Sequence, residues 1–467
     1  MQFFVLLVFF PITVLAITFE EFEAVSPKAG GLAGWGSPAA ADLNNDGIMD
    51  AVMATPAGTV VAVSSNGETL WKTKIPRIDC SETSKSDRVY STPAIGSLSG
   101  DGRQQVVLGY GGFNGKGCEG GVVAIHGDTG EVAWNFRIKR WGKNKKVWIY
   151  RNSVVSTPLI SDLDNDGFQE VVVGSWSRFV YVLNHLGKVN LAVHTADTVW
   201  SSPTMIDTAP RKTVVIGSDI SRNDGLKTKN GGNIFFIDPL ASKSIVGFPD
   251  RNSVRVLDMV YLDQVLFSSP VIADVDPTSE GSEVIIGSGC YFKNKGAWVK
   301  VVSVNTGQVL HTLPVARCSA STPAIGDINN DGVKDIVSWV STGSEGRVVA
   351  YTLKNGSPEV LWEKGLDHKP VAFQSPLILE GDSPVVLIPA SKFVEIIDGD
   401  TGQTIDTLST GVSGFSNIVV TDINTDGTPD LVIGGTSRER GVGGTIKFFL
   451  GESESAFDNA DRRNWRG

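Results

Sequence analysis

Short apolar segments recur along the whole chain and are separated by polar turns. A typical unit holds four of them: an apolar strand after a Ser-Pro or Ser-Thr-Pro marker, a Val/Ile-rich strand, a strand that often begins with Gly, and a strand that often carries Trp. Turns such as Asn66-Gly67 and Asp128-Thr129-Gly130 are typical of β-hairpins. The pattern therefore predicts antiparallel hairpins repeated in tandem.

The Ser-Pro markers set the period of the repeat, with a Ser-Asn pair in the last unit. They begin at Ser37, Ser91, Ser156, Ser202, Ser269, Ser321, Ser375 and Ser416. A period of this size with short strands is typical of a β-propeller, whose blades are four-stranded antiparallel sheets. We therefore expect an all-β chain that forms a single propeller of eight blades, with seven as the alternative.

Four loops that follow the first strand of a unit share the pattern Asp-x-Asp/Asn-x-Asp-Gly-x-x-Asp/Glu. Calcium takes six to eight oxygen ligands, and a tight loop can surround it where a Gly allows the turn. We expect the side chains at positions 1, 3, 5 and 9 and the carbonyl at position 7 to bind four calcium ions. These ligands are Asp42, Asn44, Asp46, Ile48 and Asp50; Asp162, Asp164, Asp166, Phe168 and Glu170; Asp327, Asn329, Asp331, Val333 and Asp335; and Asp422, Asn424, Asp426, Thr428 and Asp430.

These loops differ from EF-hands, which need flanking helices and a bidentate Glu at position 12. Val/Ile-rich strands flank them instead, so we expect a cation held in a hairpin loop. The alternative is a metal-free Asp/Asn/Gly turn, because these residues favour turns in any case. Three or four carboxylates held together would repel one another without a counter-charge, which favours the metal.

The remaining loops depart from the pattern. Asp274, Asp276 and Glu283 keep the charges but span one extra residue, and they form a candidate fifth calcium site. The loop at 97–105 keeps a single carboxylate, Asp101, and the loops near Asp207 and Glu380 are shortened. We expect no metal in the shortened loops.

The acidic loops resemble those of the FG-GAP/VCBS repeat family, the calcium-binding propeller repeats of integrin alpha subunits and many secreted proteins. The segment from Gly121 to Trp134 is also similar to the repeat of quinoprotein-like propellers. The resemblance covers about residues 35–450. It implies the fold and the metal but no single activity, because propellers host many functions.

Closure of the ring predicts the domain boundaries. Residues 17–24 alternate apolar and polar positions like a half-buried strand, and we expect them to complete the last blade. The propeller would then span residues 17–450, and residues 451–467 would form a polar C-terminal tail.

The first 16 residues are apolar and end in Val14-Leu15-Ala16, which suits a signal peptide cleaved after Ala16, although the segment carries no basic residue. The alternative is an uncleaved membrane anchor, for which the stretch is short. We expect a secreted, extracellular monomer without a further membrane span. The net charge of -10 over 467 residues lacks the basic balance that nucleic-acid binding needs.

Four cysteines in a secreted chain suggest two disulfides with three alternative pairings. In a propeller, connections between second and third strands share a face with connections between blades. That geometry favours Cys80–Cys118 and Cys290–Cys318, on the face opposite the acidic loops.

The long connections on this opposite face are where we expect binding, because loops on a rigid scaffold usually carry function. One of them is basic and aromatic, and attraction of acidic groups and stacking on sugar or peptide would suit it. Its candidate ligand-binding residues are Arg140, Trp141, Lys143, Lys145, Lys146, Trp148 and Tyr150. The alternative is a solvated hairpin whose aromatic side chains pack beneath it.

Three functions follow from these features. The first is a calcium-stabilised binding or adhesion module for an extracellular protein or glycan. The second is a secreted polysaccharide lyase, which needs a base and a charge-neutralising cation in one cleft. The five histidines are scattered and show no paired spacing, so we expect no catalytic residues. A quinone-dependent dehydrogenase is the third, but its adjacent cysteines are absent.

Overall fold

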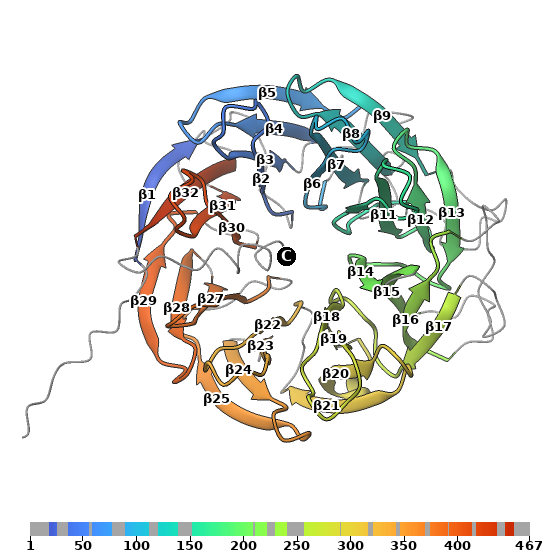
Figure 1. Ribbon diagram of the computed structural model, residues 1–467, viewed down its shortest axis with the longest axis vertical. Coiled ribbons are helices and arrows are strands. Elements are labelled where there is room, and N and C mark those ends of the chain that lie inside the picture. Colours follow the sequence, from blue (N-terminus) through green and yellow to red (C-terminus); the bar gives the residue numbers. More distant parts are fainter. Residues whose placement is uncertain are drawn as a thin grey trace, which may run out of the picture.

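In the computed structural model, eight four-stranded antiparallel sheets follow one another around a ring (Figure 1). The prediction of an eight-bladed propeller is confirmed, and the seven-bladed alternative is wrong. The structure describes residues 18–25, 36–55, 58–76, 89–111, 120–138, 152–208, 211–221, 229–240, 256–289, 291–315, 321–341, 346–368, 374–390, 392–412, 417–436 and 444–452. None of these residues forms a helix with the length and apolar character needed to cross a bilayer.

In blades 1 to 7, strands A to D follow one another in chain order from the inside of the ring to the outside (Figure 1). Blades 1 to 4 consist of β2 (Ala39–Ala41), β3 (Asp50–Ala54), β4 (Thr59–Val63) and β5 (Thr69–Lys74); β6 (Ala94–Gly96), β7 (Gln105–Tyr110), β8 (Gly121–His126) and β9 (Val132–Arg137); β10 (Leu159–Ser161), β11 (Glu170–Ser175), β12 (Phe179–Leu183) and β13 (Val189–His194); and β14 (Thr204–Thr208), β15 (Arg211–Ile220), β16 (Gly231–Ile237) and β17 (Val256–Leu262).

Blades 5 to 7 repeat this order, and blade 8 takes its fourth strand from the other end of the chain. Their strands are β18 (Val271–Ala273), β19 (Glu283–Gly287), β20 (Ala297–Ser303) and β21 (Val309–Val315); β22 (Ala324–Gly326), β23 (Asp335–Ser341), β24 (Gly346–Thr352) and β25 (Glu359–Gly365); β26 (Leu377–Leu379), β27 (Val385–Ala390), β28 (Phe393–Asp398) and β29 (Thr404–Ser409); and β30 (Val419–Thr421), β31 (Asp430–Thr436), β32 (Gly444–Glu452) and β1 (Thr18–Val25). A short 3-10 turn, η1 (Lys293–Lys295), precedes β20.

The ring closes where β1 pairs antiparallel with β32, from Thr18 opposite Glu452 to Val25 opposite Ile446. This is the position at which the alternation of residues 17–24 places a strand. Because β1 lies outside β32, it covers the outer edge of the C strand of blade 8.

Apolar contacts between neighbouring blades form the core. In blade 2, for example, the B strand β7 is buried along its whole length, and the C strand β8 is buried except at its last residue. The D strands alternate, as in β5, because one side faces solvent. Each of the eight interfaces between adjacent blades holds its own cluster of buried residues, so the core is itself a ring.

The Ser-Pro markers join the blades at the start of the A strands. A backbone N–H of one marker donates to the side-chain oxygen of the next marker around the ring. The six links are Ser37 to Thr92 (2.9 Å), Thr157 to Ser202 (2.9 Å), Ser202 to Ser269 (2.9 Å), Ser269 to Thr322 (3.2 Å), Thr322 to Ser375 (3.1 Å) and Ser375 to Asn417 (2.7 Å). The recurring hydroxyl is therefore an inter-blade contact, and Asn417 replaces it with an amide oxygen.

The Trp of the D strand joins the blades on the outside of the ring. Trp71 Nε1 donates to the carbonyl oxygen of Gly127 in the next blade at 2.6 Å. A Cβ on Gly130 in the same turn would lie 2.7 Å from the Trp71 ring, and its φ is +73°. Trp134 with Gly187 and Trp362 with Gly402 repeat this arrangement. The Gly turn and the Trp of the repeat are therefore partners from successive blades.

Candidate metal centres on one face of the propeller

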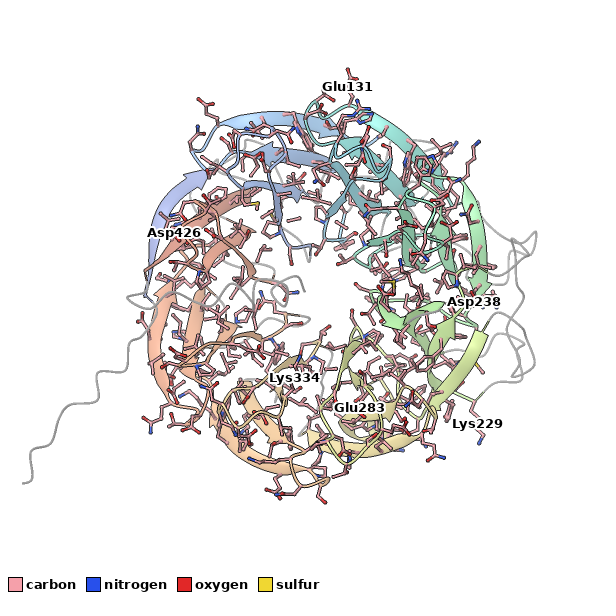
Figure 2. The ribbon with its side chains drawn as sticks, in the orientation of Figure 1. Glu131, Lys229, Asp238, Glu283, Lys334 and Asp426 are labelled. Atoms are coloured by element: carbon pink, nitrogen blue, oxygen red, sulfur yellow. The ribbon has the colours of Figure 1, made fainter. Side chains whose placement is uncertain are left out.

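The four acidic loops are all A–B connections, and they lie on one face of the ring. Neighbouring A–B loops touch: Gln169 N–H donates to the Leu98 carbonyl at 2.9 Å, and Met49 N–H donates to the Ile423 carbonyl at 3.3 Å. Figure 2 labels Asp426 in the blade 8 loop and Lys334 in the blade 6 loop, at different points around the ring.

Within each loop, backbone N–H groups point at the predicted ligand side chains. In blade 1 the carboxylate of Asp42 accepts from the N–H of Asp46 (3.1 Å) and of Gly47 (2.9 Å). Asn44 Oδ1 also accepts from Asp46 N–H at 3.0 Å, and Asp46 Oδ1 accepts from Ile48 N–H at 2.9 Å. These bonds fold positions 1, 3 and 5 around a common side of the loop.

The other three loops repeat this arrangement. The carboxylate at position 1 accepts from the Gly at position 6 in blade 3 (3.0 Å), blade 6 (2.8 Å) and blade 8 (3.0 Å). The Asp at position 5 accepts from the N–H at position 7 in the same blades, at 2.8, 3.0 and 2.7 Å. The Gly φ values lie between +85° and +92°, a conformation that other residues rarely adopt.

Blade 3 brings three carboxylates close together. One oxygen from each of Asp162, Asp164 and Asp166 lies within 4.8 Å of the others. Hard carboxylate oxygens gathered around one point are the ligands that calcium prefers. The chemistry of these three residues fits a calcium ion, and Glu170 at position 9 stays the predicted fourth side chain.

The acid at position 9 is buried beneath each loop. Asp50, Glu170, Asp335 and Asp430 are at most 4% exposed. Burial, reinforced by the other carboxylates of the loop, raises the pKa of Glu170 to about 7 and the pKa of the other three to about 6. A bound divalent cation would supply the opposite charge that these buried groups lack.

The same buried acid holds the residue at position 2. Leu43 N–H donates to Asp50 Oδ2 at 3.0 Å, and Leu163 N–H donates to Glu170 Oε2 at 2.9 Å. The side chains of both leucines are 2% exposed and pack in the core between their own blade and the next. Ile328 and Ile423 have the same bonds and the same burial. Each acidic loop is therefore tied to a contact between blades.

The loop of blade 2 has the same form without the same charge. Ser97 Oγ accepts from Gly102 N–H at 2.9 Å, and Gln105 Oε1 accepts from Leu98 N–H at 2.7 Å. Its carboxylate, Asp101, pairs with Arg103 at 2.7 Å, and this hydrogen bond lowers the pKa of Asp101. An arginine from the loop itself thus balances its charge.

In blade 5, only one acid of the candidate fifth site makes the contact that its counterpart makes in the other loops. Val275 N–H donates to Glu283 Oε2 at 3.0 Å, as at position 9 of the other loops. Asp276 instead pairs with His311 Nε2 at 2.5 Å and accepts from Thr278. Burial opposes ionisation of Asp276, but the bonds from Thr278 and His311 outweigh it and lower its pKa. Asp276 is thus engaged by protein groups.

A second histidine pair, which the sequence spacing did not indicate, lies on the opposite face. His368 follows β25, and Glu395 lies in β28 of the next blade. Glu395 Oε1 accepts from His368 N–H at 2.9 Å and lies 3.1 Å from His368 Nδ1. The two residues are 27 positions apart, so only the arrangement of blades brings them together.

Two sequence-based predictions fall outside the described residues. All four cysteines lie there, so the pairings Cys80–Cys118 and Cys290–Cys318 stay predictions. The basic and aromatic candidates Arg140, Trp141, Lys143, Lys145, Lys146, Trp148 and Tyr150 lie there as well.

No protein-family model matches the chain, and no curated protein matches it either. Among solved structures, BamB from Moraxella catarrhalis has 16% sequence identity and a TM-score of 0.56, with 93% of this chain and 100% of BamB covered. The exotype rhamnogalacturonan lyase YesX has 13% identity and a TM-score of 0.57, covering 93% of this chain and 76% of its own. A rhamnogalacturonan lyase from Bacillus licheniformis has 14% identity and a TM-score of 0.58, covering 92% and 75%.

These similarities show the β-propeller fold, since all three identities are low. They include lyases as well as BamB, so the shared fold does not select an activity. The resemblance of the acidic loops to FG-GAP/VCBS repeats rests on the loops themselves.

Proposed function

We propose that this protein is a calcium-binding propeller that acts as a rigid binding or adhesion module for an extracellular protein or glycan. The observation that carries the proposal is the contrast between the blade 2 loop and the four acidic loops. All five share the backbone turn, but blade 2 has one carboxylate and supplies Arg103 to balance it. The blade 3 loop gathers three carboxylates above a fourth that is buried.

Lysines reach two of the acidic loops but balance little of this charge. Lys354 Nζ lies 3.1 Å from Asp331 Oδ2, which is one of the three acids in that loop. Lys212 reaches the blade 3 loop from blade 4 and contacts the Asp162 carbonyl and Asn165 Oδ1, which are uncharged. A divalent cation is therefore the counter-charge that this arrangement needs.

The ligand atoms favour calcium among divalent cations. Each loop offers side-chain oxygens at positions 1, 3, 5 and 9 and a carbonyl at position 7, and water would complete the shell. Calcium accepts such irregular shells of six to eight oxygens, whereas magnesium demands octahedral geometry and keeps its waters. Zinc and copper prefer nitrogen or sulfur ligands, which these loops lack.

Calcium would act on the ring as a whole because position 2 of each loop packs between blades. Ordering the loop fixes Leu43, Leu163, Ile328 or Ile423 in the interface with the next blade. A propeller stiffened in this way presents the B–C and D–A connections on its other face as fixed binding elements.

Thermal unfolding with and without calcium tests the proposal. Calcium at 100 times its Kd should add about 2.7 kcal/mol per site to the free energy of unfolding, and a chelator should remove this gain. Magnesium at the same concentration is the control. A melting temperature that is the same in calcium and in chelator would contradict the proposal.

The alternative function is a secreted polysaccharide lyase, and the paired His368 and Glu395 are the observation that favours it. Incubation with pectin-type polysaccharides distinguishes the two functions. Unsaturated products would favour the lyase, and saturable binding without products would favour the binding module.

A further inference from the structure

A half-buried aromatic ring in blade 7 has two nitrogen-bearing side chains beside it. The ring of Phe393, the first residue of β28, lies 4.0 Å from the His368 ring, centroid to centroid. Lys392 Nζ lies 5.4 Å from the Phe393 centroid. Lys392 lies in the B–C connection, Phe393 directly follows it, and His368 belongs to a D–A connection, so all three lie on the face opposite the acidic loops.

A buried carboxylate fixes the orientation of His368. Glu395 Oε1 lies 3.1 Å from Nδ1 of His368 and engages this ring nitrogen. The backbone N–H of His368 donates to the same oxygen at 2.9 Å and keeps the residue in place. Nε2 is therefore the ring nitrogen that is left for a ligand, an arrangement shared by histidines that bind ligands or transfer protons.

Glu395 differs from a carboxylate that serves packing alone. It is 0% exposed, and its Oε2 has no hydrogen-bond partner within the described part of the chain. Buried polar atoms are nearly always paired, and an unpaired one costs about 1–3 kcal/mol. A purely structural role for the pair does not offset this energetic cost, whereas a role in holding His368 for a ligand explains why a buried carboxylate is kept there.

We propose that His368, Lys392 and Phe393 form a binding site for an acidic sugar. The ammonium group of Lys392 would contact the sugar carboxylate, and Nε2 of His368 would form a hydrogen bond with a sugar hydroxyl. The Phe393 ring would contact the apolar face of the sugar. Glu395 is the positioning residue. Asp367, which is exposed beside His368, opposes an anionic ligand and limits its affinity. This assignment names the ligand class of the proposed binding module and places it in blade 7.

Calorimetric titration of the calcium-loaded protein with oligogalacturonate tests the site, and a neutral galactose oligomer is the comparison ligand. Saturable binding of the acidic oligomer is expected. His368→Asn and Lys392→Met should each weaken it, and Lys392→Met should do so by about tenfold, the factor expected for one charge-assisted hydrogen bond. Asp367→Asn should strengthen it. His185→Asn is a matched control, because His185 also stacks on a phenylalanine (Phe168, 4.2 Å) but lies on the acidic-loop face.

The Glu395→Gln variant separates positioning from stability. It should weaken binding and change the distribution of the proton between Nδ1 and Nε2 of His368, measured by nitrogen NMR of the imidazole. Equal binding of the neutral oligomer, or unchanged affinity in both the His368 and Lys392 variants, would overturn the site. Calcium-dependent melting is measured on the same samples, so loss of the sugar site and failure of the calcium proposal are distinguishable.

Discussion

The backbone N–H of Leu163 donates to the buried carboxylate of Glu170 at 2.9 Å, while the Leu163 side chain packs in the core between blades 3 and 4. One residue thus connects a proposed metal ligand with an interface between blades. Metal binding and blade packing should therefore depend on each other, because moving the leucine moves the loop that carries the proposed ligands.

The first prediction concerns this link. Leu163→Ala should lower the free energy of unfolding by about 2–5 kcal/mol, since it leaves a cavity between two blades. It should also weaken calcium binding at the blade 3 loop, because Leu163 lies between two proposed ligands. Denaturant unfolding and calcium titration measure the two effects. Val360→Ala is the control, as Val360 is 55% exposed. A variant that loses stability but keeps full calcium affinity would contradict the link.

The second prediction concerns the number of ions. Asp166→Asn removes one of the three clustered carboxylates in blade 3, and the affinity of that site for calcium should fall by at least about tenfold. Calorimetry should then count one strong site fewer than in the parent protein. Asp101→Asn alters the equivalent position of the blade 2 loop, where Arg103 already balances the charge, and should leave the count unchanged. Equal counts in all three proteins would argue against metal in blade 3.

The turn of the acidic loops could be predicted from sequence because all their proposed ligands lie within nine consecutive residues. The blade count followed from the markers for a similar reason, since each blade carries its own copy. The hydrogen bond between Leu163 and Glu170 is also local in sequence. The feature that could have indicated it is the apolar residue at position 2, between the acidic positions 1 and 3. His368 and Glu395 could not be paired in this way, because their contact depends on how one blade lies against the next.

The third prediction concerns the turn glycines that face a Trp of the preceding blade. Gly130 has a φ of +73°, and a Cβ there would lie 2.7 Å from the Trp71 ring. Gly130→Ala should destabilise the protein by about 1–3 kcal/mol, from backbone strain and from displacement of Trp71. Gly365→Ala is the control, because a Cβ at Gly365 meets no atom within 4 Å. Equal melting temperatures for the two variants would show that the Trp contact is not required.

The fourth prediction concerns pH and uses a carboxylate far from the acidic loops. The carboxylate of Asp219 lies next to Thr198, whose hydroxyl donates to Asp219 Oδ1 at 2.8 Å. Burial, reinforced by the charge of Asp197, raises the pKa of Asp219 well above its ordinary value, although Thr198 and Arg178 oppose the shift. In the unfolded chain the pKa returns to about 4.

The sign of the effect follows from proton binding. Between about pH 4 and the raised pKa, the folded protein keeps a proton that the unfolded chain has lost, so the contribution of Asp219 to stability falls as pH rises through this range. Asp219→Asn cannot ionise and should raise the melting temperature at alkaline pH more than at about pH 5. Calorimetry across this range, with calcium saturating, measures the difference. Asp406→Asn, at an exposed position, is the control. A loss of stability that grows with pH in Asp219→Asn would show that the carboxylate is ionised and stabilising in the folded protein.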